Sequence, residues 1–480
     1  MMDESKTPLL NALKKLVSQP HAAFYAPGHK QGKGSSCDLV DLIGKSVLKA
    51  DLPELPELDN LFAPSGAIEQ AQKLAALAFK ADRTWFLVNG SSCGIIAAIL
   101  ASCGTGDKII LPRNIHSSAI AGLVLSGAIP IFINPEYDPE VGLAYNVTPE
   151  AVASALKQHP DTKAVMMLHP TYQGICGDLK AIAQITHQYD IPLLVDEAHG
   201  AHFGFHDDLP PSALSVGADL TVQSTHKVLS AMTQASMLHL KGDRLCSQRI
   251  SRALQLVQST SPSYILLASL DAARGQVATQ GHELMTRTIS LATEAKKIAA
   301  IPRLSVLTPN KQPGCQYIDP TRLTIDVSQL GITGFAADEI LHELKVTCEL
   351  PLLHHLTFII SLGNTPEDIE QLIQACQTLS KIAPQTISSH KILLPPSFIP
   401  YSSKSPREAY FASAETIPIA QASDRLCGEL ICPYPPGIPL LMPGEIITNE
   451  AIDYLQQIIS EGGTITGCND PTLKTIQILK

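Results

Sequence analysis

A lysine with polar neighbours ends a short apolar stretch near the middle of the chain. Residues 221–227 read TVQSTHK, so Ser224, His226 and Lys227 follow a β-branched start that favours a buried strand. If this strand is parallel, its C-terminal end faces the crevice where open α/β sheets bind ligands. A lysine that is desolvated there becomes a nucleophile. The alternative is an exposed loop lysine, which is the usual environment of lysine, so other residues have to decide.

A glycine- and serine-rich segment, NGSSCG at residues 89–94, precedes a predicted helix over 95–102. Backbone N–H groups and the helix dipole at a helix N-terminus together bind anions. Ser91 and Ser92 are therefore candidate phosphate ligands. Ser91 is equally well explained as an ordinary helix N-cap.

A carboxylate pair follows another apolar stretch in the sequence PLLVDEAHGAHFGFH. A buried Asp196 requires a cation or strong donors, because burying an isolated charge is costly. In one interpretation Asp196 pairs with a protonated ring nitrogen of a cofactor, and His199 lies beside that ring. In the other, Asp196 or Glu197 joins the loop histidines in a metal site, although the spacing matches no specific ligand pattern. The histidines concerned are His199, His202 and His206.

His116 follows the predicted strand 108–111 together with Arg113 and Asn114. An imidazole at a strand end can stack on a flat ring, and its alternative is an ordinary histidine at a helix start. A helix start for a phosphate, an aspartate for a pyridine nitrogen and a lysine for an aldehyde together describe a pyridoxal phosphate site.

Apolar runs that alternate with helical patterns must position these residues. Strands that are apolar throughout are typical of a parallel sheet covered on both faces, so we predict a doubly wound α/β domain. A helical stretch over about 275–300 leads to a smaller α+β domain with strands at 322–327 and 356–362. The predicted strands of the large domain are 85–88, 108–111, 129–133, 164–168, 192–195, 220–222 and 237–240.

Four parts are predicted along the chain. Residues 1–66 form an N-terminal arm and irregular segment, with a helix over 7–17, and 67–300 form the large α/β domain. Residues 301–386 form the small α+β domain. Residues 387–480 form a C-terminal segment that packs on the active-site side and opens with a proline-bearing linker over 387–400.

The amino-acid composition indicates a globular protein and argues against several other classes. The 480 residues have a hydrophobic fraction of 45% and a net charge of −10, which fits a globular chain and argues against a nucleic-acid partner. The 11 cysteines contain no Cys-x-x-Cys pair, so neither a disulfide framework nor a thiolate zinc site is indicated. The N-terminus lacks the pattern of a signal peptide, and no apolar run is long enough to span a bilayer. We therefore expect a cytoplasmic protein without a membrane partner.

The chain resembles the ornithine/lysine/arginine decarboxylase family of fold-type I pyridoxal phosphate enzymes, in its bacterial short form. The resemblance implies an aspartate-aminotransferase-like large domain with a mainly parallel sheet and a smaller C-terminal domain. The matching residues are Ala26 to Lys30, Asn89 to Ser91, Arg113 with Asn114 and His116, Asp196 to His199, Ser224 to Lys227, Thr233 to Ser236, Thr260 to Pro262, Pro433 to Pro439, and Pro443 to Glu445.

The resemblance also implies roles for individual residues. Lys227 would hold the cofactor aldehyde, Asp196 would contact the pyridine nitrogen, and His116 would stack on the ring. His199 would lie near the substituents of the ring, and Thr260 would reach the phosphate from the neighbouring subunit. The remaining phosphate ligands would be Ser91, Ser92, Ser224 and His226.

The chain departs from the family at Ser117, where lysine is common, and at Cys93, where a small or hydroxyl residue is usual. Neither departure affects the central lysine or aspartate. Because the Pro27-Gly28-His29 motif comes early, we expect no N-terminal wing domain and no decamer. A homodimer or tetramer with shared active sites is expected instead.

The implied reaction is decarboxylation of a basic L-amino acid in polyamine metabolism, with Lys227 or His226 returning a proton to Cα. Arginine is favoured, ahead of lysine or ornithine. Carboxylates that could recognise the basic side chain are Glu445, Glu429 and Asp59. Two alternatives remain: an aminotransferase or lyase of the same fold, with Arg322 on the substrate carboxylate, and a pyridoxal phosphate- or metal-binding protein without decarboxylase activity.

Overall fold

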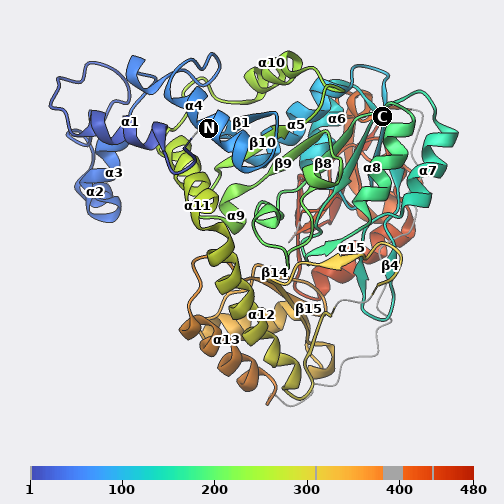
Figure 1. The fold of residues 1–480 in the computed structure, drawn as a ribbon. Coiled ribbons are helices and arrows are strands. Elements are labelled where there is room, and N and C mark those ends of the chain that lie inside the picture. Colours follow the sequence, from blue (N-terminus) through green and yellow to red (C-terminus); the bar gives the residue numbers. More distant parts are fainter. Residues whose placement is uncertain (1–2, 309–310, 382–403, 435–436) are drawn as a thin grey trace. The chain divides into compact units, whose positions relative to one another are not determined.

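The computed structural model describes residues 3–308, 311–381, 404–434 and 437–480 (Figure 1). The chain divides into two compact units, 1–101 with 194–286 and 102–193 with 287–480. The predicted linker 387–400 lies outside the described residues, and the four-part division of the sequence stays a prediction. Within the described part of the chain, no helix combines the length and apolar character needed to cross a membrane.

A seven-stranded sheet has the strand order β1-β10-β9-β8-β6-β2-β3. The parallel pairs include β8 with β9, β2 with β3, and β2 with β6, which confirms the predicted α/β fold. β10 instead runs antiparallel to both β9 and β1, because the short connection after β9 holds no crossover helix. The bounds are β1 (Arg83–Leu87), β2 (Lys108–Pro112), β3 (Ile129–Ile133), β6 (Thr162–Leu168), β8 (Leu193–Asp196), β9 (Leu220–Gln223) and β10 (Ser236–Leu240).

Among the helices of the first unit, α1 matches the helix predicted over 7–17. The helix predicted from 95 begins earlier, at Gly90, and the helix predicted from about 275 begins at Tyr264. The polar residues 90–92 form the first turn of α5, and the serine-rich turn 259–263 precedes α11; these polar residues masked the helical pattern. The helices that begin in the first unit are α1 (Pro8–Val17), α2 (Cys37–Ile43), α3 (Lys45–Ala50), α4 (Ala67–Ala78), α5 (Gly90–Ser102), α9 (Thr225–Val228), α10 (Ser247–Val257) and α11 (Tyr264–Ala295).

The second unit contains a four-stranded antiparallel sheet with the order β11-β13-β15-β14. Helices α12 and α13 pack on this sheet around one apolar core (Figure 1). The strand predicted over 356–362 runs over residues 355–359, because a turn at 361–364 ends it. The bounds are β11 (Ser305–Val306), β13 (Arg322–Asp326), β14 (Leu350–Pro351), β15 (His355–Ile359), α12 (Gly334–Glu343) and α13 (Pro366–Leu379).

Further helices and two-stranded sheets complete the second unit. The helices are α6 (Ser117–Ser126), α7 (Pro149–Gln158), α8 (Leu179–Gln188), α14 (Pro406–Tyr410) and α15 (Asn449–Ser460). The paired strands are β4 (Tyr137–Asp138) with β5 (Leu143–Ala144), β7 (Ile175–Cys176) with β12 (Tyr317–Ile318), β16 (Ala414–Pro418) with β19 (Thr475–Leu479), and β17 (Cys432–Tyr434) with β18 (Thr464–Thr466). The last two pairs flank α15 and share its apolar core.

A buried ion pair on α11 holds the N-terminal arm. Oδ2 of Asp271 accepts the backbone N–H groups of Leu9 and Leu10 at 2.9 and 3.2 Å, at the start of α1. The N-cap residue of α1, Thr7, makes no side-chain capping bond, so Asp271 supplies the cap. Arg274 pairs with Asp271 at 2.6 Å and donates to two carbonyl groups of the arm. Both side chains of the pair are fully buried.

The first prediction concerns this pair. Replacing Asp271 with Ala should lower the free energy of unfolding by about 3 kcal/mol, because it leaves the buried guanidinium of Arg274 unpaired and α1 uncapped. Urea denaturation measures this loss. Glu294→Ala is the matched control, since Glu294 and Lys297 form an exposed pair at the same i,i+3 spacing and should contribute little. Equal losses in the two variants would contradict the anchoring role of Asp271.

Candidate active site

Lys227 lies on the one-turn helix α9, directly after the buried strand β9. Its Nζ lies 2.9 Å from Nε2 of His199, which is 3% exposed and lies in the loop after β8. An ammonium group has no lone pair, so a charged Lys227 must donate to an unprotonated Nε2. Two stretches that the sequence singled out independently therefore come together at these two atoms.

Asp196 is the last residue of β8 and is only 4% exposed. It pairs in register with Val222 of β9, and its Oδ1 accepts the backbone N–H of Ala198 at 3.1 Å. The carboxylate thus lies at the C-terminal end of a buried parallel strand, as the sequence predicted. Its role toward a cofactor stays a prediction.

The N-terminus of α5 lies close to the end of β9. The hydroxyl of Ser224, which is fully buried, donates to Oγ of Ser91 at 2.8 Å. A Cβ at Gly94 would lie 2.7 Å from atoms of both Leu87 and Val222, so glycine is what allows the helix to approach the sheet. Ser91 and Ser224 therefore converge, whereas Ser92 is exposed at the same helix start.

His226 is half-buried on α9, and its Nδ1 lies 2.9 Å from the backbone carbonyl oxygen of Ala235. A carbonyl oxygen can only accept, so Nδ1 carries a proton. His226 can consequently donate a proton from Nε2 only as an imidazolium. This restricts the proton-donor role predicted for His226.

The turn that contains Thr260 is tied to the segment just before α5. The side-chain carbonyl of Gln258 accepts from the backbone N–H of Val88 at 2.9 Å, and that of Asn89 accepts from Ser259 at 3.2 Å. Thr260 itself is exposed. Gln234 has no role predicted from the sequence; its amide donates to the carbonyl of Val88 at 2.6 Å from a left-handed backbone position. Its place in the motif from Thr233 to Ser236 was the available signal.

In the second unit, His116 is the N-cap of α6 and its Nδ1 accepts the backbone N–H of Ser118 at 3.1 Å. His116 therefore lies at a helix start, and its stacking on a cofactor ring stays a prediction. Arg113 donates to the carbonyl groups of Pro439 and Leu440, both at 2.7 Å, and to Glu445 at 3.0 Å. This residue thereby ties together two segments of the predicted motif.

The three carboxylates considered for substrate recognition all have partners in the fold. Glu445 is 1% exposed and pairs with Arg113, and burial raises its pKa to about 7. Glu429 accepts the backbone N–H groups of Asn469 and Gln477, both at 2.8 Å. Asp59 accepts backbone N–H groups at the start of α4, including that of Gly66 at 2.7 Å. Each carboxylate has a structural role in this conformation.

The loop histidines take separate partners. His199 contacts Lys227, His202 packs against the ring of Phe203 at 4.8 Å, and His206 contacts Thr286 at 3.0 Å. Among the described residues, no three or more His, Cys, Asp or Glu side chains form a cluster that could hold a metal ion.

Arg322, the candidate for an aminotransferase role, is 2% exposed on β13. Its Nη1 lies 3.9 Å from the carboxylate of Asp319, so it belongs to a buried ion pair in the second unit. Burial lowers its pKa. The guanidinium is therefore part of the interior of the small antiparallel sheet region.

Glu197 accepts hydrogen bonds from several parts of the first unit, a role that was not predicted from the sequence. Its carboxylate is fully buried and accepts from the backbone N–H of Ala213 at 2.7 Å, from Thr221 Oγ1 at 3.1 Å and from Gln223 Nε2 at 2.8 Å. Burial raises the pKa of Glu197 to about 7. Glu197 directly follows Asp196, so a buried Glu197 also needs hydrogen-bond donors. That requirement was the signal in the sequence that could have identified Glu197.

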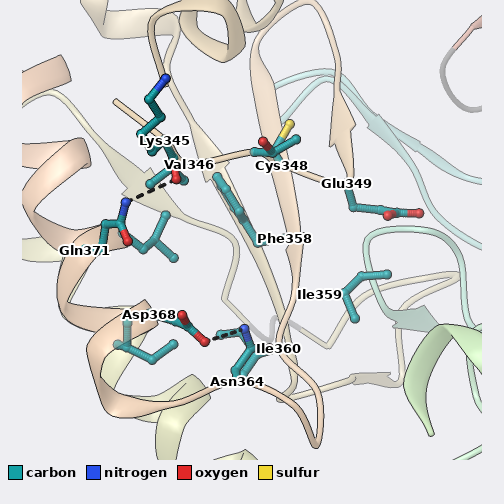
Figure 2. Close-up of a pocket in the computed structure, with 13 residues that line it drawn as sticks. Lys345, Val346, Cys348, Glu349, Phe358, Ile359, Ile360, Asn364, Asp368 and Gln371 are labelled. Carbon is teal, nitrogen blue, oxygen red and sulfur yellow. Dashed lines mark hydrogen bonds between the residues drawn. The ribbon is translucent and has the colours of Figure 1, made fainter. Parts of the chain in front are cut away.

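A cavity of about 460 Å³ lies in the second unit beside α13 (Figure 2). The side-chain amide of Gln371 points to the backbone of Lys345 and donates to its carbonyl at 3.1 Å (Figure 2). The lining residues also include Glu349, Phe358 and Asp368, and they contain none of the predicted site residues. We assign this cavity no part in the chemistry.

Comparison with known proteins identifies relatives along the whole chain. The model of the Orn/Lys/Arg decarboxylase major domain matches residues 7–313, and that of the C-terminal domain of the same family matches residues 397–468. An arginine decarboxylase of Bacillus subtilis is 40% identical, with 100% of this chain and 99% of the relative covered. A lysine decarboxylase of Pseudomonas aeruginosa is 25% identical, with 94% of this chain and 75% of the relative covered.

The solved structure of the constitutive lysine decarboxylase of Escherichia coli matches with a TM-score of 0.85 at 22% identity. The match covers 100% of this chain and 82% of that chain, which shows a common fold. Taken with the family models, these similarities confirm the resemblance stated from the sequence. The chain belongs to the Orn/Lys/Arg decarboxylase family.

Proposed function

We propose that this protein decarboxylates a basic L-amino acid with pyridoxal phosphate, and that its substrate is arginine. The contact of Lys227 Nζ with His199 Nε2 at 2.9 Å carries the proposal, because it places a nucleophilic amine at the strand ends where the motif predicts the cofactor. Asp196 ends the neighbouring strand β8, and Ser224 meets Ser91 at the start of α5.

The residues of the first unit fit pyridoxal phosphate. The amine of Lys227 would bind the aldehyde, and the carboxylate of Asp196 would keep the pyridine nitrogen protonated. The hydroxyls of Ser91 and Ser224 and the N-terminus of α5 would hold the phosphate. The hydroxyl of Thr225 is buried and has no hydrogen-bond partner among the described residues, so it offers this region a further donor.

Bound pyridoxal phosphate supplies an electron-withdrawing ring that accepts the electron pair left on Cα when the carboxylate departs. The negative charge of Asp196 would favour this acceptance, because it would stabilise a protonated pyridine nitrogen. Carbon dioxide leaves and one proton takes its place on Cα, so the reaction consumes a proton. Lys227, or His226 as an imidazolium, would deliver that proton. His199 would orient the amine of Lys227 through the contact described above.

Arginine is favoured because the 40%-identical relative from Bacillus subtilis, matched over the full chain, is named an arginine decarboxylase. Agmatine would then be the product, and the enzyme would contribute to polyamine synthesis. Lysine is the principal alternative, since the more distant relative from Pseudomonas aeruginosa is named a lysine decarboxylase. Ornithine is the third substrate of the family.

The assembly and the location are further parts of the proposal. Thr260 lies on an exposed turn, which suits a phosphate contact made in a neighbouring subunit, so a homodimer is the proposed minimum active unit. A tetramer of such dimers is compatible with this contact. The family resemblance assigns His116 to the cofactor ring, and the protein is proposed to act in the cytoplasm.

The second prediction concerns substrate choice. With pyridoxal phosphate present, release of carbon dioxide from arginine should exceed release from lysine and from ornithine by about tenfold or more in kcat/KM, which corresponds to roughly 1.4 kcal/mol in transition-state binding. Labelled carbon dioxide and the amine product are measured side by side for the three amino acids. A preference for lysine or ornithine would contradict the proposed substrate.

The third prediction concerns Lys227. Lys227→Ala should reduce turnover to background, because the family resemblance assigns both the binding of the aldehyde and the return of the proton to this amine. Lys73→Ala is the matched control, since Lys73 is an exposed lysine paired with Glu69 at 2.7 Å in the same unit. Normal amine production by Lys227→Ala would overturn the assignment of the cofactor lysine.

A further inference from the structure

A chain of buried side chains runs across the first unit from Glu197 to Thr84. Nε2 of Gln223 donates to Glu197, and the carbonyl oxygen of Gln223 lies 3.1 Å from Nε2 of His239. The other ring nitrogen of His239 lies 2.7 Å from the hydroxyl of Thr84. All four side chains are 3% exposed or less, so water does not compete for these contacts.

We propose that Glu197 is a positioning residue for the cofactor site, and that the proton on its carboxylate sets the direction of the whole hydrogen-bond chain to His239. The proposal rests on the proposed function for the identity of the cofactor. The direction of the hydrogen bonds is a property of the protein alone and is tested separately.

The positioning role follows from where the three donors to Glu197 lie. Glu197 directly follows Asp196 at the end of β8, whereas Thr221 and Gln223 lie on β9, directly before Ser224. The third donor, Ala213, begins the 3₁₀ turn at residues 213–216. The carboxylate thus bridges the strand that presents Asp196 and the strand that leads to Lys227. Losing this bridge leaves buried donors without partners at both strand ends.

Two directions of the chain keep the hydroxyl of Thr221 as a donor to Glu197 and leave every other contact with one donor and one acceptor. With Glu197 ionised, the amide of Gln223 must donate to it, which turns the carbonyl of Gln223 toward His239. Nε2 of His239 then carries the proton, and Nδ1 accepts from Thr84. With Glu197 protonated, its O–H donates to the carbonyl of Gln223, the amide of Gln223 donates to Nε2, and the proton of His239 moves to Nδ1.

His239 has one ring proton in both directions, because burial lowers its pKa to about 3. It is also stacked on Phe79, with ring centroids 4.6 Å apart. Around Glu197, the nearest titratable residues along the chain are Asp196, His199 and His202, while β10 contributes His239. β9 and the turn at 213–216 contribute hydroxyl, amide and backbone groups that do not titrate. The raised pKa of Glu197, about 7, has burial as its largest cause.

The fourth prediction is a tautomer change in His239. Correlation of ring protons with ring nitrogens in full-length protein carrying ¹⁵N-histidine should show the Nε2–H form above pH 7 and the Nδ1–H form below it. Glu197→Gln should show the Nδ1–H form throughout. Its carbonyl must accept from the fixed N–H of Ala213, so its amide faces Gln223 and reverses that side chain.

Glu445→Gln is the control, because it removes another buried carboxylate whose partner is Arg113. This variant should retain the pH-dependent change of His239. The same tautomer of His239 in the wild type and in Glu197→Gln at every pH would overturn the proposed coupling. That result would not bear on decarboxylation, whereas turnover by Lys227→Ala would overturn the proposed function and leave the tautomer result standing.

A second measurement tests the positioning role through cofactor binding. In a spectroscopic titration of cofactor-free protein, Glu197→Ala should weaken pyridoxal phosphate binding by about tenfold, while Glu197→Gln should stay within about threefold of wild type. If Glu197→Ala does not fold, Gln223→Met replaces it, because this variant removes the middle of the chain. It should weaken binding and abolish the pH response of His239. Wild-type affinity for pyridoxal phosphate in Glu197→Ala, or in Gln223→Met where that replaces it, would contradict the positioning role.

Discussion

Two adjacent carboxylates buried at the end of one strand impose the constraint on which the site depends. A carboxylate removed from water is stable only where donors or a cation replace its hydration. Asp196 and Glu197 meet this demand differently. Glu197 takes its donors from β9 and the turn at 213–216, and Asp196 accepts from the backbone N–H of Ala198. The demand for donors therefore links β8 to β9, the strand that leads to Lys227.

Elsewhere the fold uses the same solution to attach distant segments. Asp271 with Arg274 fastens the start of α1 to α11, and Glu445 with Arg113 holds the C-terminal motif on the segment after β2. In each case the buried carboxylate is stabilised by hydrogen bonds from backbone N–H groups and by one arginine of opposite charge. These pairs determine where a segment is held, and the apolar cores supply most of the stability.

Much of the fold could be predicted from the sequence because its strands are apolar throughout. The strand pattern located all seven strands of the sheet, and the motif residues placed Lys227, His199 and Asp196 near one another. Antiparallel β10 was not apparent, since strand direction depends on the connection and apolar content does not encode it. Glu445 was considered for substrate binding, but a single sequence does not reveal that Arg113 occupies its carboxylate.

The proposed function depends on Lys227 as the residue that holds pyridoxal phosphate. Reduction with borohydride fixes an aldehyde cofactor covalently to the lysine that binds it, and mass analysis of the digested protein then locates it. We expect a single pyridoxyl adduct on the peptide that contains Lys227, with none on this peptide when the cofactor is omitted. An adduct on a different lysine, or an unmodified Lys227 peptide in protein saturated with the cofactor, would contradict it.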